Sequence, residues 1–149
     1  MALIESWLYK RLAGDADVAK FVQNRISPVY APEAIAERDP NNWSYPFIVY
    51  LRGSTERTYV SGAKAQRDGL PVGKFHVHLW HNDYFALKQL EQTVSLALET
   101  APLAVDGFFI DHCFIENEFD VPEPLHDGIQ FPTFGVQFDL EIAAQEPLP

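Results

Sequence analysis

The chain has 149 residues, 47% of them hydrophobic, and a net charge of −10 with neutral histidines. This length predicts a single domain over residues 1–149, whose core is large enough to fold without a disulfide or metal. The single cysteine, Cys113, excludes an internal disulfide framework and fits a reducing compartment, where it would act as a small buried apolar residue. Glu5 and Lys10 interrupt the N-terminal apolar pattern, so we expect neither a signal peptide nor a membrane span.

The charge is unevenly distributed along the chain. Lys88 is the last basic residue, and twelve acidic residues follow it, whereas the first 88 residues carry eleven bases and nine acids. Such an acidic half argues against binding nucleic acid by bulk attraction. It predicts a particle with one strongly negative face.

The N-terminal third predicts two short helices and an extended segment. Apolar residues recur at helical spacing over Leu3–Leu12, and Gly14 is a typical helix end. Asp15 can cap a second helix that runs through Val22. The segment Ile26–Val29 is expected to be extended, because a residue before proline avoids the helical region.

The middle of the chain predicts an interior strand and a long hairpin. A loop over Ala31–Ser44 precedes the strand Phe47–Leu51, whose two faces are both apolar, as in a strand with neighbours on both sides. Arg52–Ser54 is expected to bulge, because it contains a glycine. The irregular segment Glu56–Val72 would form the hairpin tip, and a loop of this length is typically either a docking element or mobile.

The clearest unit is a strand followed by a helix. Phe75–Leu79 alternates apolar and polar residues, Asp83 can cap the next element, and Tyr84–Glu99 has the spacing of an amphipathic helix about 24 Å long. Pro102 prevents the helix from continuing. The predicted buried stripe consists of Leu87, Leu90, Val94, Ala97 and Leu98.

Two strands complete the prediction, Phe108–Phe119 with mixed faces and Phe134–Ile142 with strict alternation, followed by a frayed tail over residues 143–149. Because strands occur in blocks instead of alternating with helices, we predict an α+β fold. Its twisted, mostly antiparallel sheet would carry the long helix and the short N-terminal helix on one side, with a long hairpin loop.

The histidines suggest one candidate chemical site. His76 and His78 share a strand face and His81 lies just beyond, which would suit a zinc-dependent hydrolase. The spacing superficially resembles the HxHxDH signature of metallo-β-lactamase-like hydrolases, but the third histidine and the aspartate are misplaced. The remaining His112 and His126 have no accompanying motif. Structural or interface histidines are the alternative.

Other searches of the sequence give no chemical motif. The sequence has no phosphate-binding glycine loop, nucleophile elbow or CxxC pair, and its acidic run Glu116–Asp120 lacks the spacing of a calcium loop. We therefore predict no catalytic, cofactor-binding or metal-binding residue.

The order of these weak motifs resembles the tail-completion (tail-terminator) family of tailed bacteriophages and prophages. The resemblance covers about Ile4 to Ile142 and depends on the short N-terminal helix, the segment Asn24-Arg25-Ile26-Ser27-Pro28, the strand Tyr45-Pro46-Phe47-Ile48-Val49-Tyr50, the variable hairpin, the strand before the long helix, and the alternating last strand.

The resemblance implies a structural protein that needs no cofactor. Such proteins form a ring, usually a hexamer, at the head-proximal end of the tail tube, where they end tube growth and join the tail to the head connector. The implied partners are other copies of the chain, the tail-tube protein and the connector protein, with DNA passing through the lumen without specific binding and no membrane contact. The implied location is the virion tail, assembled in the host cytoplasm.

Charge suggests where the subunits of such a ring would meet. A basic hairpin on one subunit could reach the acidic surface of the next, while an exposed aromatic residue is typical of protein interfaces. The hypothesised interface residues are Arg57, Lys64, Arg67, Lys74, Trp80, Glu116, Glu118 and Asp120. The alternatives are a metal-dependent hydrolase that uses His76, His78 and His81, or another head–tail connector or tail-tube subunit.

Overall fold

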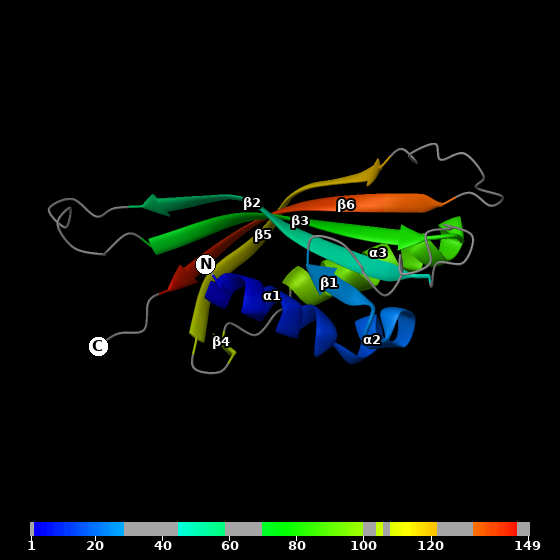
Figure 1. Cartoon of the computed structure of the whole chain (residues 1–149), viewed down its shortest axis with the longest axis horizontal. Coiled ribbons are helices and arrows are strands. Elements are labelled where there is room, and N and C mark those ends of the chain that lie inside the picture. The colour runs from blue at the N-terminus through cyan, green and yellow to red at the C-terminus, as the bar shows by residue number, and fades with distance from the viewer. Residues whose placement is uncertain are drawn as a thin grey trace, which may run out of the picture.

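The computed structural model describes residues 2–28, 45–58, 70–99, 104–105, 108–121 and 133–145. In Figure 1 a twisted sheet lies along the top of the molecule, and the helices lie beneath it on one face. This arrangement confirms the α+β prediction.

The described sheet has six strands in the order β1-β2-β3-β6-β5-β4. Only the pairing of β1 with β2 is parallel, and all other neighbours are antiparallel. The strands are β1 (Ile26–Pro28), β2 (Phe47–Thr58), β3 (Leu70–His81), β4 (Ala104–Val105), β5 (Phe108–Val121) and β6 (Phe134–Gln145). Over Ile48–Tyr50, β2 lies between β1 and β3, as expected for an interior strand.

The three helices of the described residues begin and end close to their predicted limits. They are α1 (Ala2–Ala13), α2 (Ala16–Val22) and α3 (Tyr84–Glu99). Asp15 Oδ1 accepts hydrogen bonds of 3.0 Å from the backbone N–H groups of Asp17 and Val18, which caps α2. Asp83 Oδ1 accepts one of 3.1 Å from Ala86 N, which caps α3. None of the described helices combines the length and the apolar character needed to cross a membrane.

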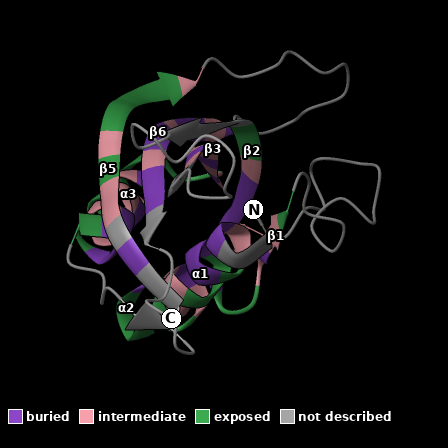
Figure 2. Cartoon of the chain, turned by 90° about the vertical axis from the view of Figure 1, so that its left-hand side faces the viewer, coloured by how far each residue is buried: buried purple, intermediate pink, exposed green. Residues whose placement is uncertain are grey.

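The core fills the space between the sheet and the helices (Figure 2). Phe75, Val77 and Leu79 of β3 point into it, and all five residues of the predicted α3 stripe are buried. The burial of apolar side chains from both layers stabilises the fold, at roughly 25 cal/mol per Å² removed from water. From α1 the core receives Ile4, Trp7, Leu8 and Leu12.

Arg25 fastens the N-terminal region to the sheet. Its Nε donates to the carbonyl oxygen of Pro46 at 2.8 Å, and its own carbonyl accepts from Ile48 N at 2.9 Å. The conformation of Asn24-Arg25-Ile26-Ser27-Pro28 is therefore set by contacts with residues about twenty positions away.

Two predicted boundaries are wrong. The hairpin strands reach Thr58 and resume at Leu70, so both ends of the expected irregular segment Glu56–Val72 belong to strands. Strand β6 continues to Gln145, so residues 143–145 are not a frayed tail. The rest of the tail, 146–149, lies outside the described residues, as do the predicted loop at 31–44 and the hairpin tip at 59–69.

Two strands, β2 and β5, deviate from regular pairing. The register shifts between Arg52 and Ser54, which confirms the predicted bulge in β2. Strand β5 has two shifts, between Ile110 and His112 and between Ile115 and Asn117. Each shift changes which side chains face the core, and this explains the mixed faces of β5 in the sequence.

Candidate functional site

The face of the sheet opposite the helices carries a connected set of polar side chains, which we call the outer face. The β3–β6 register places alternate residues of the two strands side by side on it, with Lys74 opposite Glu141 and His76 opposite Asp139. The outer face consists of Lys74, His76, His78 and Trp80 from β3, Gln137, Asp139 and Glu141 from β6, and His112, Phe114, Glu116, Asn117 and Phe119 from β5.

Lys74 links three strands. Its Nζ lies 2.7 Å from Glu116 Oε1 on β5 and 2.9 Å from Glu141 Oε1 on β6. These hydrogen bonds, first to Glu116 and then to Glu141, raise the pKa of Lys74. The bond from Lys74, followed by one from His112, lowers the pKa of Glu141. The groups are partly exposed, so each pair contributes at most about 1 kcal/mol to stability.

Asp139 is the centre of a second network. His76 Nδ1 and Gln137 Nε2 each lie 2.7 Å from Asp139 Oδ1, and Asn117 Nδ2 donates to Oδ2 at 3.4 Å. Burial opposes the charge on Asp139, but the hydrogen bonds from Gln137 and His76 outweigh it and lower the pKa of the carboxyl. The network fixes His76 beside a carboxylate.

The histidines of the hydrolase hypothesis are engaged separately. His76 contacts Asp139, while His81 Nδ1 accepts from Asn82 N at 2.9 Å. Burial, followed by the nearby His76, lowers the pKa of His78. Over the described ranges, no group of three or more His, Cys, Asp or Glu side chains is placed to hold a metal ion.

An apolar cluster occupies the end of the outer face near His81. Trp80 is half-buried and packs with Tyr45, Phe47 and Val49. Its indole also lies directly over Gly135, where an added Cβ would come within 2.7 Å of Cζ3. Trp80 therefore packs within its own chain, and a part of its surface stays exposed to solvent.

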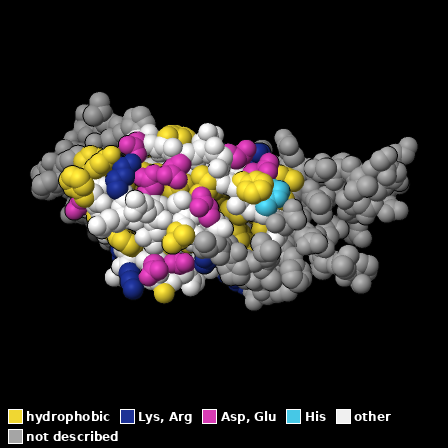
Figure 3. All heavy atoms as spheres, turned by 180° about the vertical axis from the view of Figure 1, so that it is seen from behind, with side chains coloured by type: hydrophobic (Ala, Val, Ile, Leu, Met, Phe, Trp, Pro, Cys, Tyr) yellow, Lys and Arg dark blue, Asp and Glu magenta, His cyan; other side chains and the backbone are white. Residues whose placement is uncertain are grey.

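The predicted acidic residues of β5 divide between the two faces. Glu116 belongs to the outer face, whereas Glu118 and Asp120 pair in register with the core-facing Phe138 and Val136 and lie beside α3. Figure 3 shows acidic and hydrophobic side chains interspersed over the surface seen from behind.

Lys88 of α3 holds two of the nearby carboxylates, Asp120 at its Oδ1 and Glu91 at 3.0 Å. Burial opposes the charge of Lys88, but these hydrogen bonds outweigh it and raise the pKa. Glu118 shares a hydrogen bond with Glu91, and this contact, with burial and the charge of Glu91, raises the pKa of Glu118 to about 7.

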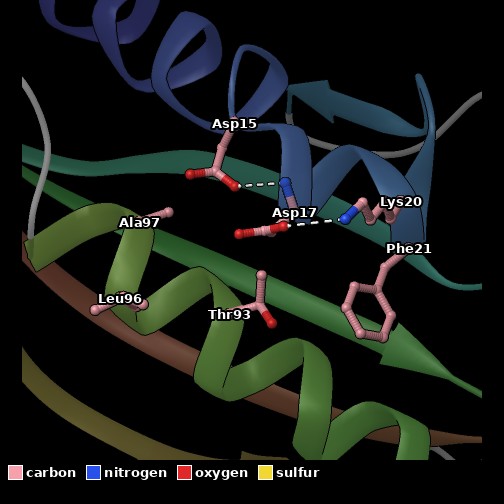
Figure 4. Close-up of a pocket in the computed structure, with 7 residues that line it drawn as sticks. All are labelled: Asp15, Asp17, Lys20, Phe21, Thr93, Leu96 and Ala97. Carbon is pink, nitrogen blue, oxygen red and sulfur yellow. Dashed lines mark hydrogen bonds and ion pairs between the residues drawn. The ribbon is translucent and has the colours of Figure 1, made fainter.

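A cavity between α2 and α3 was not predicted from the sequence (Figure 4). It has a volume of about 360 Å³, and Asp17 and Lys20 pair across 3.4 Å at its edge. The sequence contains at most a weak signal, because Leu96 lies outside the predicted buried stripe, as single apolar residues on helix surfaces often do. The lining residues are Asp15, Asp17, Lys20, Phe21, Thr93, Leu96 and Ala97.

The four remaining predicted positions are the three basic residues of the hairpin and Cys113. Arg57 occupies a β2 position that pairs in register with Pro71, and Lys64 and Arg67 lie outside the described residues. Cys113 packs against the core, as expected, and burial followed by the charge of Glu99 raises its pKa to about 12, which keeps the thiol protonated.

The fold has counterparts among solved structures. The chain matches one in the virion of a native gene transfer agent (GTA) particle with a TM-score of 0.61 and 14% sequence identity, over 92% of this chain and 90% of that one. It also matches the structure of the bacteriophage SPP1 gp17 protein with a TM-score of 0.48 and 14% identity, over 99% of this chain and 93% of that one. No protein-family model and no curated protein sequence matches it. The chain thus shares its fold, over most of its length, with a component of a GTA virion.

Proposed function

We propose that this chain is a structural subunit of a tailed, virion-like particle. It forms a ring at the head-proximal end of the tail tube, ends tube growth and joins the tail to the head connector. The observation that supports this proposal most strongly is the fold shared with a GTA virion chain over 92% of this chain and 90% of that one. The resemblance of its motif order to tail-completion proteins points to the same function.

The charge distribution suits a channel through which DNA passes. On the outer face Lys74 is paired with Glu116 and Glu141, so its positive charge is largely neutralised within the chain. A net charge of −10 per subunit repels phosphate and keeps DNA from adhering. We infer that the acidic half of the chain lines or borders the lumen.

The proposed contact between subunits joins a basic hairpin to an acidic surface. Arg57, Lys64 and Arg67 supply the positive charge, and the acidic half of the next subunit, which includes Glu118 and Asp120, supplies the negative charge. Lys74 and Glu116 already pair within one chain, so they would border this contact. The exposed part of Trp80 is the proposed point of contact with the tube or the connector.

The purified protein tests the ring directly. Light scattering over a range of concentrations should show an assembly of about 100 kDa, the mass of six copies of a 16.9 kDa chain. Electron microscopy of the same sample should show rings with a central opening. Persistent monomers at every concentration, even with the tail-tube protein encoded by the same genetic element, would contradict the proposal.

Deletion of the gene distinguishes a terminator from its nearest alternatives. We expect tubes of irregular length that are not joined to heads, and we expect the wild-type gene supplied in trans to restore complete particles. Particles without any tube would instead indicate a tube subunit, and tubes of normal length that lack heads would indicate a connector.

A further inference from the structure

Strand β5 presents a long edge that no other described strand covers. On the side away from β6, its neighbour β4 pairs only with Phe108 and Phe109. From Cys113 to Val121, β6 is the only strand that pairs with β5 among the described residues. Figure 2 shows this part of β5 at the outer margin of the sheet. Within the described part of the chain, half of the backbone hydrogen-bonding groups of these nine residues therefore face away from any strand.

The opposite margin of the sheet has a second open edge. Strand β1 pairs with β2 only over Ile48–Tyr50. From Leu51 to Thr58, β3 is the only strand that pairs with β2 among the described residues. This eight-residue edge is close in length to the open part of β5.

The two edges carry opposite charge. The β5 edge contains Glu116, Glu118 and Asp120 and no lysine or arginine, whereas the β2 edge contains Arg52 and Arg57 against Glu56. The register places positions 52 and 57 on the same side of the sheet as Phe75, the side that also carries Glu118 and Asp120. In a continuous sheet Arg52 and Arg57 would lie on the same side of the junction as Glu118 and Asp120, whereas Glu116 lies on the other side.

The carboxylates beside β5 also exceed the positive charge available to them. Lys88 already binds Glu91 and Asp120, while Glu118 shares a hydrogen bond with Glu91. The raised pKa of Glu118, about 7, is the expected result of such crowding. A guanidinium or ammonium from a partner would relieve it.

We propose that the β5 edge (113–121) of one copy pairs with the β2 edge (51–58) of the next copy, so that one sheet continues from subunit to subunit. This inference rests on the proposed ring and identifies its interface. Within one subunit β5 runs antiparallel to β2, because each of the three steps from β2 through β3 and β6 to β5 reverses the strand direction. Neighbouring copies that continue the sheet in the same orientation keep this relation, so the pairing between them is antiparallel. Two different surfaces meet, as closure of a ring requires.

Charge excludes the simplest competing arrangement. If two β5 edges paired about a two-fold axis, their glutamates and aspartates would face one another, and like charges across a strand pair are destabilising. The β5–β2 contact instead joins acidic to basic residues. It also turns the outer faces of all subunits toward the same side of the ring.

Paired charge reversals test the interface. We expect E118K/D120K, which makes the β5 edge basic, and R52E/R57E, which makes the β2 edge acidic, each to raise the protein concentration for half-assembly at least tenfold. An equimolar mixture of the two should assemble at nearly the wild-type concentration, because every β5–β2 contact in an alternating ring is again complementary. The control S6K/D17K/Q89K changes the net charge by +4, as E118K/D120K does, at exposed helical positions outside both edges and should assemble like wild type.

Hydrogen exchange tests the same contact without mutation. Backbone amides within 113–121 and 51–58 should become protected on assembly of the wild-type protein. If rings form but these amides stay unprotected, or if both variants assemble alone, the edge pairing is wrong while the ring remains. A protein that never assembles would refute the ring itself, and a stable two-fold dimer would refute the β5–β2 pairing.

Discussion

Gly135 is the residue whose identity the outer face specifies most tightly. A Cβ at this position would come within 2.7 Å of Trp80 Cζ3, and the indole is also held by Phe47 and Val49. We expect Gly135→Ala to displace the indole of Trp80 and to lower the free energy of unfolding by about 1–3 kcal/mol. Chemical denaturation of the two proteins measures the difference.

A double-mutant cycle identifies the cause of that loss. If the clash is responsible, Gly135→Ala should cost much less in a Trp80→Leu background, because the smaller side chain leaves room for the added methyl group. An equal cost in both backgrounds would mean that the backbone conformation at Gly135, not the indole, opposes the substitution.

The Asp139 network predicts a specific dependence on pH. The hydrogen bonds from Gln137 and His76 lower the pKa of Asp139 below its ordinary value of 3.8. Their stabilisation is therefore complete above about pH 4 and is lost as the pH falls through the lowered pKa. We expect Asp139→Asn to be less stable than wild type by about 1–2 kcal/mol at pH 7 and to approach it in strong acid.

Urea denaturation over that pH range measures the convergence. The control Asp17→Asn removes an exposed carboxylate outside the network. Its pair with the exposed Lys20 and its place in the first turn of α2 contribute about 0.5 kcal/mol, so its curve should stay close to that of wild type. A difference for Asp139→Asn that stays constant down to pH 2 would show that the carboxylate charge does not contribute to the network.

At the scale of the elements, the cap of α3 is separable from its packing. Asp83 Oδ1 accepts a hydrogen bond from Ala86 N, while the helix is otherwise held by its buried stripe. Asp83→Ala should lower the free energy of unfolding by about 1 kcal/mol. Asp83→Ser should lower it much less, because serine also caps helices. Thermal unfolding followed by circular dichroism compares the three proteins, and equal losses for both variants would argue against a capping role.

The elements that the sequence predicted best are those determined by neighbouring residues. The cap at Asp83 and the stripe from Leu87 to Leu98 follow from spacing within one helix, and the structure reproduces both. The alternation in β6 is equally local. The helix-covered face of the sheet and its α+β class followed from these patterns.

What the sequence could not predict depends on pairing across long separations. The two bulges of β5 arise from its register with β6, so the face assigned to Glu118 differs from that of Glu116 for a reason absent from the local pattern. The contact of His76 with Asp139 joins residues 63 positions apart. The cavity between α2 and α3 likewise depends on how the two helices pack.

For the whole molecule, net charge and edge charge act in opposite directions on assembly. Each subunit has a net charge of −10, so subunits repel one another at long range. The opposite charges at the proposed β5–β2 contact attract one another at short range. The Debye length falls from about 30 Å at 0.01 M salt to about 8 Å at 0.15 M and 3 Å at 1 M. Moderate salt screens the long-range repulsion but leaves much of the contact attraction, and high salt weakens both.

Assembly should therefore be strongest at intermediate salt. Light scattering at fixed protein concentration should show the largest assembled fraction near 0.1–0.2 M NaCl, with less at 0.01 M and at 1 M. The R52E/R57E variant lacks the attraction between the two edges, so its assembled fraction should increase steadily with salt. A steady increase for wild type as well would mean that hydrophobic burial, not edge charge, holds the ring together, because screening would then remove repulsion alone.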